Sequence, residues 1–212
     1  MNNTLTFRFA KRSDTALILQ FIKELAAYEK ILDDVVADEA TLETWIFDKQ
    51  KAEVIFAVVD NKEIGFALFF HNFSTFLGRS GIYLEDLYVK PECRGNGYGK
   101  AILKKLASIA VERSCGRLEW WCLDWNKPSI DFYLSLGAKP MSDWTVYGHG
   151  YGKAILKKLA SIAVERGCGR LEWWCLDWNK PSIDFYLSLG AKPMSDWTVY
   201  RIAGDALKEL AD

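Results

Sequence analysis

Apolar residues in the N-terminal half of the chain recur with two different periodicities, which distinguish helices from strands. From Ala16 to Leu25 they recur at helical spacing, and Ser13 and Asp14 offer oxygens that can cap the start of that helix. Asp38 is expected to open a second, short helix in the same way. Alternating or β-rich runs predict strands at residues 5–9, 53–59, 64–71 and 81–89, with a polar turn at residues 60–63.

The C-terminal half begins with a glycine-rich loop and then alternates helix and strand. Residues 98–113 and 128–136 have the helical pattern, whereas residues 118–123 and 144–147 are β-rich. Pro128 suits the first turn of its helix, where a missing N–H costs nothing, and Gly137 suits the C-terminal cap. The order is strand, two helices, three strands, then helix, strand, helix and strand. This order predicts an α/β (α+β) fold with a mixed sheet.

This C-terminal half occurs almost twice in the chain. Residues 98–147, the first repeat, recur as residues 151–200, the second repeat, with 49 of 50 positions identical and only Ser114 replaced, by Gly167. Solenoid repeats diverge in sequence, so two nearly identical copies of a mixed segment indicate a recent or engineered tandem duplication. Removing one 53-residue copy from the 212 residues leaves 159, an ordinary domain length. We expect one domain at 1–147 and a second copy of its C-terminal half, with a tail, at 148–212.

Charge and hydropathy argue against a nucleic-acid-binding protein and against a membrane protein. With 27 Lys and Arg against 28 Asp and Glu, the net charge is -1, so no uniformly basic surface exists to follow a nucleic-acid backbone. The longest uncharged apolar run, residues 64–70, is far shorter than the roughly 20 residues that span a bilayer, and no signal-peptide pattern is present. We therefore expect no nucleic-acid partner, no membrane partner and a cytoplasmic location.

The number and spacing of cysteines and histidines argue against disulfides, metal sites and a histidine triad. The five cysteines form no CxxC pair and lie in hydrophobic surroundings, which favours buried reduced thiols over disulfides or a zinc site. With only two histidines, His71 and His149, we expect neither a catalytic histidine triad nor a metal centre. Cys122 is not expected to act as a nucleophile, because it has no histidine partner.

The most informative segment is the loop Arg94-Gly95-Asn96-Gly97-Tyr98-Gly99, between a strand and a helix. Its glycines permit positive φ angles and close approach of the backbone, so successive N–H groups and the positive end of the helix can surround a pyrophosphate. The spacing differs from a Walker loop, which needs Gly-Lys-Ser/Thr, and from a dinucleotide fingerprint. Taken alone, the loop can equally be a tight strand-to-helix turn without a ligand.

Four further segments give the loop a context: Tyr83-Leu84-Glu85-Asp86-Leu87-Tyr88-Val89, Trp125-Asn126-Lys127-Pro128-Ser129-Ile130-Asp131-Phe132-Tyr133, Gly137-Ala138 and Ile22-Lys23-Glu24-Leu25-Ala26-Ala27-Tyr28-Glu29. Together with the loop they resemble the GNAT superfamily of N-acetyltransferases, whose acetyl-CoA loop has the form Q/R-x-x-G-x-G/A. Within it they are similar to the spermidine/spermine (diamine) N-acetyltransferase group. The resemblance covers essentially all of the 159-residue unique chain. It implies a GNAT fold whose mostly antiparallel sheet is splayed at the acetyl-CoA cleft.

The same resemblance implies acetyl-CoA as co-substrate and assigns residues to it. Backbone groups of Leu87, Tyr88 and Val89 would hold the pantetheine and acetyl group, and Asn126 would support the pantetheine arm. The residues that would bind the pyrophosphate are Arg94, Gly95, Asn96, Gly97, Tyr98, Gly99 and Lys100. Tyr133 matches the general acid that protonates the departing thiolate, which suits a phenol with a pKa of about 10.

The amine substrate has to lose a proton before it attacks, because an alkylammonium with a pKa of about 10 is almost fully charged at neutral pH. Glu85 matches the family position that draws this proton away, and Asp86 and Glu29 are candidates to hold a cationic amine. Strand alternation predicts that Glu85 and Asp86 point to opposite faces. For the three acids the alternative is a solvated residue or an ion pair, and for Tyr133 it is an aromatic of the core.

The second repeat lacks parts of this site. Tyr147 stands in place of Arg94, and no strand equivalent to residues 83–89 precedes it. The first repeat directly follows the Glu85 strand, and its shorter loop closure favours it for completing the sheet. Only the second repeat, however, continues into the C-terminal segment 205–210. If the second repeat completes the sheet instead, Tyr186 takes the acid role.

One N-terminal half serves two C-terminal halves, so the strand at residues 171–176 is expected to lack its sheet partner. We expect it to pair with its counterpart in another chain, giving a homo-oligomer, a dimer that is domain-swapped through the duplicated segment. The function expected first is transfer of acetyl from acetyl-CoA to a primary amine (diamine, polyamine or lysine-like) by direct attack in a ternary complex. Two alternatives stay open: a non-catalytic or crippled acyl-CoA-binding scaffold, and an acetyltransferase for a protein or antibiotic amine.

Overall fold

The computed structural model describes residues 4–141, 144–148 and 153–211. Contacts group the chain into two compact units. The first unit is Met1–Trp120 with Ile202–Asp212, and the second unit is Trp121–Arg201. The two boundaries fall inside strands, whereas the division expected from the repeat lies between residues 147 and 148. The units of packing and the units of sequence repetition are therefore different segments of the chain.

The helices and strands alternate much as the sequence pattern predicts. The strands are β1 (Thr6–Phe9), β2 (Glu53–Val59), β3 (Lys62–Ser74), β4 (Arg79–Val89), β5 (Arg117–Leu123), β6 (Lys139–Pro140), β7 (Trp144–Gly148), β8 (Glu172–Leu176), β9 (Lys192–Pro193) and β10 (Trp197–Ala203). The α-helices are α1 (Thr15–Glu29), α2 (Glu39–Leu42), α3 (Tyr98–Glu112), α4 (Lys127–Ser135), α5 (Lys153–Glu165), α6 (Lys180–Ser188) and α7 (Asp205–Ala211). Short 3₁₀ turns lie at η1 (Arg12–Asp14), η2 (Leu32–Asp34) and η4 (Pro91–Cys93), and a π-helical segment, η3 (Glu43–Asp48), follows α2. In the part of the chain that the structure describes, every helix is too short or too polar to cross a membrane.

The strands form two sheets. The order of hydrogen-bonded strands is β1-β2-β3-β4-β5-β10-β6 in a seven-stranded sheet and β8-β7-β9 in a three-stranded sheet. β4 and β5 pair in parallel, whereas β1 with β2, β2 with β3, β3 with β4 and β10 with β6 are antiparallel. The predicted mixed, mostly antiparallel sheet flanked by helices is confirmed.

The two predicted helix caps have different outcomes. Asp38 caps α2 as expected, because its carboxylate accepts a hydrogen bond from the Thr41 amide at 2.8 Å. Asp14 does not cap α1, so that expectation is wrong. Its carboxylate instead accepts hydrogen bonds from the Lys11 amide and from the Arg8 guanidinium, each at 2.7 Å. The ion pair with Arg8 is a tertiary contact, which the sequence pattern around Asp14 does not predict.

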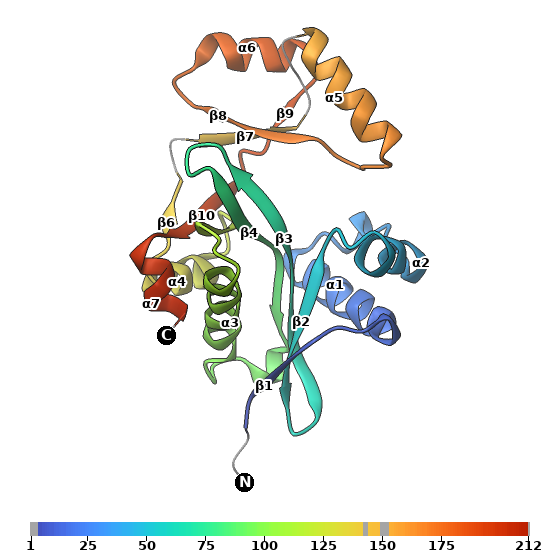
Figure 1. Cartoon of the computed structure of the whole chain (residues 1–212), viewed down its shortest axis with the longest axis vertical. Coiled ribbons are helices and arrows are strands. Elements are labelled where there is room, and N and C mark those ends of the chain that lie inside the picture. Colours follow the sequence, from blue (N-terminus) through green and yellow to red (C-terminus); the bar gives the residue numbers. More distant parts are fainter. Residues whose placement is uncertain (1–3, 142–143, 149–152, 212) are drawn as a thin grey trace. The chain divides into compact units, whose positions relative to one another are not determined.

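The core of the first unit lies on both faces of β2, β3 and β4. Figure 1 shows α1 and α2 on one side of these strands and α3 with α7 on the other. On the α1 side, the rings of Phe21 and Phe66 stack with their centres 5.3 Å apart, and Tyr88 belongs to the same cluster. On the other side, Leu103 and Leu106 of α3 are completely buried. The period-2 pattern of the strands and the apolar stripes of the helices together produce this three-layer packing.

The two repeats exchange their last strands within the chain. β7, from the first repeat, pairs with β8 and β9 of the second repeat. β10, from the second repeat, pairs with β6 of the first and takes the place beside β5. The expectation that the first repeat completes the main sheet is therefore wrong for its last strand. Only β10 continues into Ile202 and α7, which packs on α3 and buries Leu207 and Leu210.

The three-stranded sheet repeats part of the main sheet with less cover. α5 and α6 lie on one side of it (Figure 1). β8 is its edge strand, on the side where the corresponding strand of the first repeat, β5, pairs with β4. Leu106 of α3 is 0% exposed, whereas the corresponding Leu159 of α5 is 39% exposed. The same sequence thus buries less apolar surface in the second repeat than in the first.

The cysteines differ from one another more than expected. Cys115, Cys122 and Cys175 are buried free thiols, as the sequence predicts. Cys93 is half-buried and Cys168 is exposed, so the expectation of burial is wrong for Cys168. Cys168 follows α5, in the repeat whose surface is less covered.

Candidate functional site

The loop between β4 and α3 presents main-chain amides at the start of a helix. Gly95 and Gly97 have φ angles of 79° and 78°, and a Cβ atom at either would have no neighbour within 4 Å. The first amide bonded inside the helix is that of Ala101, which donates to the Gly97 carbonyl at 3.0 Å. The amides of residues 98–100 precede it and have no acceptor within the helix. The positive φ angles and the open space fit a loop that wraps around an anion.

Arg94 is held at the beginning of this loop by two aromatic rings. Its guanidinium carbon lies 4.7 Å from the ring centre of Tyr28 on α1 and 5.4 Å from that of Tyr88 on β4. Its Nε donates a hydrogen bond to the Val89 carbonyl at 2.9 Å. These contacts fix a permanent positive charge beside the exposed amides. Sequence reasoning missed Tyr28, although it lies in a segment that carries the family resemblance, next to Glu29.

The loop also has internal support from Asn96. Its Nδ2 donates to the carbonyl of Cys93 at 3.0 Å and to that of Arg94 at 3.2 Å. The amide side chain thus ties Asn96 back to the start of the turn. Asn96 stabilises the loop in a way that the sequence alone did not indicate.

The last part of β4 has a strand on one side only, among the residues that the structure describes. Its pairs with β5 run from Ile82 with Leu118 to Leu84 with Trp120 and end there. Its pairs with β3 continue to Val89, which faces Gly65. The three predicted residues 87–89 therefore lie where β4 has left β5 but still follows β3. Backbone N–H and C=O groups on such an edge are suited to bind an extended, amide-containing chain.

Glu85 is the extra residue of a β-bulge. Leu84 pairs with Phe69 and Asp86 pairs with Leu68, so no residue of β3 faces Glu85. Since Phe69 and Leu68 are neighbours, Leu84 and Asp86 point to opposite faces, although residues two apart share a face in a regular strand. The regular alternation along β4 is therefore interrupted between Leu84 and Asp86. Bulges of this kind re-aim a side chain beside a functional site.

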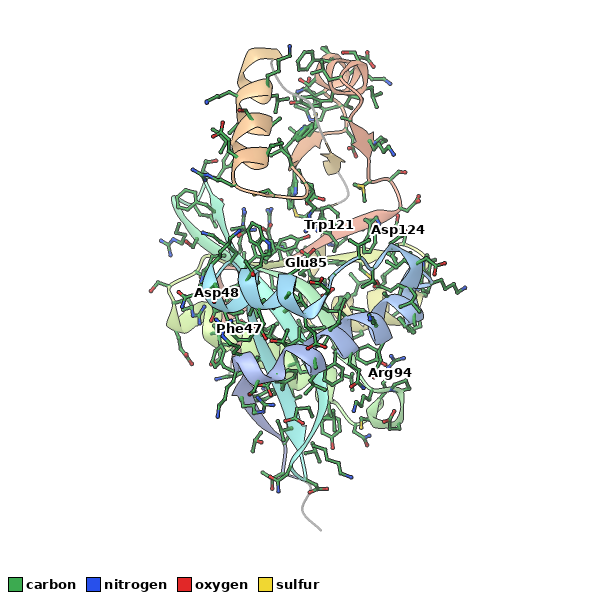
Figure 2. All side chains as sticks on the ribbon, turned by 90° about the vertical axis from the view of Figure 1, so that its right-hand side faces the viewer. Phe47, Asp48, Glu85, Arg94, Trp121 and Asp124 are labelled. Atoms are coloured by element: carbon green, nitrogen blue, oxygen red, sulfur yellow. The ribbon has the colours of Figure 1, made fainter. Side chains whose placement is uncertain are left out.

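The acidic residues come from two elements of the first unit. Glu85 and Asp86 are half-buried on β4, and Glu29 is partly buried at the last position of α1. Burial raises the pKa of Glu29 above its ordinary value. Figure 2 shows Glu85 and Arg94 apart from each other, so Glu85 and the loop that begins at Arg94 occupy separate places. Among the described residues, no group of three or more His, Cys, Asp or Glu is arranged to hold a metal ion.

Asn126 and Tyr133 belong to the second unit, where α4 positions both. Asn126 is the N-cap of α4, and its Oδ1 accepts a hydrogen bond from the Ser129 amide at 3.4 Å. Tyr133 is 8% exposed, and its ring centre lies 5.4 Å from that of Phe132 and 5.8 Å from that of Tyr200. Asn126 therefore has a structural role that sequence reasoning did not assign, and Tyr133 is held within an aromatic group.

The corresponding residues of the second repeat have other surroundings. Tyr147 and Gly148, at the places of Arg94 and Gly95, are strand residues of β7 and pair with β8 and β9. Residues 149–152 of that loop lie outside the described residues. Tyr186, which corresponds to Tyr133, has its ring centre 5.2 Å from that of Trp173, and burial raises its pKa. The start of the second loop is therefore a paired strand, unlike the turn at Arg94.

The sequence matches the family model described as "Acetyltransferase (GNAT) family" over residues 19–138 and 146–191. Thialysine N-epsilon-acetyltransferase from Bos taurus is 41% identical over 145 residues, which are 64% of this chain and 85% of that protein. Spermidine/spermine N(1)-acetyltransferase-like protein 1 from Homo sapiens is 34% identical over 143 residues, 64% of this chain and 20% of that protein. The structure of yncA from Salmonella typhimurium with its cofactor acetyl-CoA matches with a TM-score of 0.59 and 20% identity, over 95% of this chain and 94% of that one. At this identity the likeness to the solved structure shows a shared fold.

Proposed function

Since the chain belongs to the acetyltransferase (GNAT) family and is an acetyl-CoA-dependent N-acetyltransferase, we propose that it acetylates a primary amine of a small cationic molecule by direct attack in a ternary complex. The observation that carries the proposal is the loop from Arg94 to Lys100, with its positive φ glycines and its helix-start amides after a strand edge. The substrate class is a diamine, a polyamine or a lysine-like amine.

The donor is bound by main-chain groups in this proposal. The amides from Gly95 to Lys100 and the guanidinium of Arg94 bind the pyrophosphate, because a helix start and a fixed cation both favour negative charge. The strand edge at Leu87, Tyr88 and Val89 bonds the amides of the pantetheine arm. Asn126 supports this arm through the start of α4. The residues present fit acetyl-CoA.

Glu85 assists the loss of a proton from the amine. An ammonium group with a pKa of about 10 is a poor nucleophile at neutral pH until it is deprotonated. A carboxylate on a bulge can accept that proton, directly or through water, at a point that a regular strand does not reach. The neutral nitrogen then forms a bond to the thioester carbon, whose carbonyl oxygen becomes negatively charged.

Tyr133 supplies the proton for the leaving group. When the tetrahedral intermediate collapses, the C–S bond breaks and its electron pair goes to the sulfur of CoA. A phenol beside the departing sulfur can donate a proton to it as the C–S bond breaks, which leaves the neutral CoA thiol and a phenolate. The phenolate of Tyr133 is returned to the neutral form by solvent, and the products are the N-acetyl amine and CoA.

The acids and the relatives support a cationic substrate. Thialysine, named in one relative, ends in a primary amine, and spermidine and spermine, named in another, are polyamines. Asp86 and Glu29 are proposed to hold the second charge of such a molecule, since carboxylates on two elements are suited to an extended dication. We therefore favour a molecule with two amino groups over a neutral amine.

The test compares two corresponding tyrosines in the full-length protein. Tyr133→Phe is expected to lower kcat for amine-dependent CoA release by about 100-fold, because removal of a general acid costs 10²- to 10⁴-fold. Tyr186→Phe is expected to leave kcat near its original value. The assay measures free thiol with acetyl-CoA and a panel of mono-, di- and polyamines.

Two outcomes of this assay contradict the proposal. A loss of activity in Tyr186→Phe together with full activity in Tyr133→Phe assigns the acid to the second repeat. Binding of CoA without amine-dependent thiol release by the unaltered chain identifies an acyl-CoA-binding scaffold instead of an enzyme.

We also propose that a tandem duplication produced the repeat and that the chain associates through the second repeat. The support is the edge strand β8 and the exposed Leu159 of α5, because in the first repeat β5 is paired with β4 and Leu106 is buried. The occupant is a second copy of the chain, with β8 meeting β8 across a two-fold axis. The domain boundary proposed between residues 147 and 148 follows the same duplication.

A further inference from the structure

Tyr133 packs against an aromatic ring that comes from the other repeat. The ring of Tyr200, on β10, has its centre 5.8 Å from that of Tyr133, at an interplanar angle of 44°. Tyr200 and Tyr133 are 4% and 8% exposed, so the contact lies in the interior. We propose that Tyr200 of the second repeat is a positioning residue for the acid Tyr133, and that the active site therefore depends on the exchanged strand. This inference rests on the proposed role of Tyr133.

The strand that carries Tyr200 is fixed to the first repeat at several points. The Met141 amide donates to the Val199 carbonyl at 2.8 Å, and Tyr200 faces Pro140 in the strand register. Asp124, labelled in Figure 2, accepts a hydrogen bond from Thr198 Oγ1 at 2.6 Å. These contacts thus hold the stretch of β10 that carries Tyr200 against the first repeat.

A buried ring beside Tyr133 affects reaction rate through geometry. A phenol that delivers a proton has to point at the departing sulfur, and a misplacement of about 1 Å is costly for such a transfer. The backbone of Tyr133 is held at the end of α4, because its carbonyl accepts hydrogen bonds from the amides of Leu136 and Ala138 at 3.1 and 3.2 Å. The ring itself is confined by its neighbours, Phe132 and Tyr200. Loss of the Tyr200 ring would free the Tyr133 ring to rotate away from the sulfur.

Tyr147 is the corresponding residue of the first repeat and serves as a matched control. Both tyrosines end the same four-residue stretch, Trp-Thr-Val-Tyr. In β7, however, Tyr147 pairs with Trp173 and Pro193 of the second repeat. From the sequence alone, either Tyr147 or Tyr200 could lie beside Tyr133. Because the last strands are exchanged, the residue found there is Tyr200.

The experiment measures kcat and KM in four full-length variants: Tyr200→Ala, Tyr200→Phe, Tyr147→Ala, and Tyr200→Ala combined with Tyr133→Phe. Tyr200→Ala is expected to lower kcat about tenfold while KM for acetyl-CoA changes less than about twofold, since donor binding uses other residues. Tyr200→Phe is expected to keep the original kcat, because the ring and not the hydroxyl positions Tyr133. Tyr147→Ala is expected to keep the original kcat.

The double variant separates this inference from the proposed function. If Tyr200 acts through Tyr133, the double variant is expected to be no slower than Tyr133→Phe alone. A further tenfold loss in the double variant overturns the positioning role while leaving Tyr133 as the acid. Full activity of Tyr133→Phe alone contradicts the acid assignment itself.

Two more results would overturn the inference. One is unchanged kcat in Tyr200→Ala, and the other is a loss in Tyr147→Ala equal to that in Tyr200→Ala. Far-UV circular dichroism and calorimetric binding of CoA check that each variant is folded. If Tyr200→Ala does not fold, Tyr200→Leu takes its place, since it keeps apolar volume but not the ring, and the same kcat loss is expected.

Discussion

At the residue scale, the pKa of Glu29 bears on its proposed role in holding the amine. Burial at the end of α1 disfavours the charged carboxylate and so raises its pKa. The group is ionised above this raised pKa and neutral below it. A cationic substrate gains attraction only from the ionised form. From the proposed role of Glu29 we therefore expect affinity for the amine to depend on pH in a range where an unperturbed glutamate is already charged.

The corresponding prediction concerns KM for a diamine. As pH falls from about 8 to about 5, we expect KM to rise more steeply in the unaltered protein than in Glu29→Gln, because only the former loses a charge. Amine substrates stay protonated over this range, so the difference reports the carboxylate. Parallel KM profiles in the two proteins would show that Glu29 does not bind the substrate.

The candidate residues were predictable to different degrees. Arg94 and the glycines could be predicted, because a positive φ angle favours glycine and a permanent cation requires a basic residue, and both are visible in the sequence. The bulge at Glu85 could not, because it appears only when β4 is matched against β3 and Leu84 pairs with Phe69. The ring of Tyr28 under Arg94 also depends on the packing of α1 against β4. The proposed catalytic roles of these residues stay predictions.

At the scale of elements, α3 and α5 show what packing contributes beyond sequence. They share the same residues from Lys100 and Lys153 onward, yet Leu106 is 0% exposed and Leu159 is 39% exposed. α3 has α7 and two strands of the first unit as neighbours. The burial of an amphipathic helix is therefore a property of its neighbours, while its helical structure follows from its own pattern.

This pair of helices gives a matched stability test. Leu106→Ala is expected to lower the free energy of unfolding by about 3 kcal/mol, because it removes buried methyl groups and leaves a cavity. Leu159→Ala is expected to cost about 1 kcal/mol or less, since much of its side chain already contacts water. Urea unfolding followed by circular dichroism measures both. Equal losses would mean that both helices are covered to the same extent in solution.

Most element types could be predicted because hydrophobic period distinguishes strand from helix. The strand at residues 53–59 has its expected bounds, and the strands expected at 64–71 and 81–89 extend further, to Lys62–Ser74 and Arg79–Val89. The change from α2 to the π-helical segment Glu43–Asp48 was missed, because one extra residue per turn leaves no clear periodic signal.

At the scale of the whole molecule, the second repeat has an apolar surface with less cover than the same surface of the first. β8 ends its sheet, and Val164 and Trp178 are 77% and 74% exposed. Edge strands and exposed apolar residues of this kind favour association with a further chain. The whole-molecule property to measure is therefore the assembly state.

We expect the full chain to elute as a dimer at micromolar concentration and to bind little of a hydrophobic dye. Trp174→Lys, on β8, is expected to shift the chain toward monomer and to raise dye binding, because a charge opposes edge-to-edge pairing. Trp121→Lys changes the corresponding residue of β5 and serves as the control for general misfolding. A strictly monomeric unaltered chain with low dye binding would contradict association through the second repeat.

The fold class and family could be predicted because the patterns of residues 1–147 are complete in themselves. The choice of last strand could not be predicted from those patterns. Residues Trp144–Tyr147 and Trp197–Tyr200 are the same four residues, so no local propensity distinguishes them. These two stretches are followed by different segments, and the burial of Ile202, Leu207 and Leu210 after the second stretch is a long-range effect.

The exchange of β7 and β10 has a consequence for how the chain is made. A ribosome releases Trp144–Tyr147 before Trp197–Tyr200, so the nascent polypeptide meets the earlier copy first. That copy needs only a short hairpin to settle beside β6, and short closures form fastest. To reach the observed topology, the place beside β6 has to stay empty, or be vacated, until translation reaches the later copy. We therefore expect the speed of elongation between the two copies to influence which copy of the strand pairs with β6.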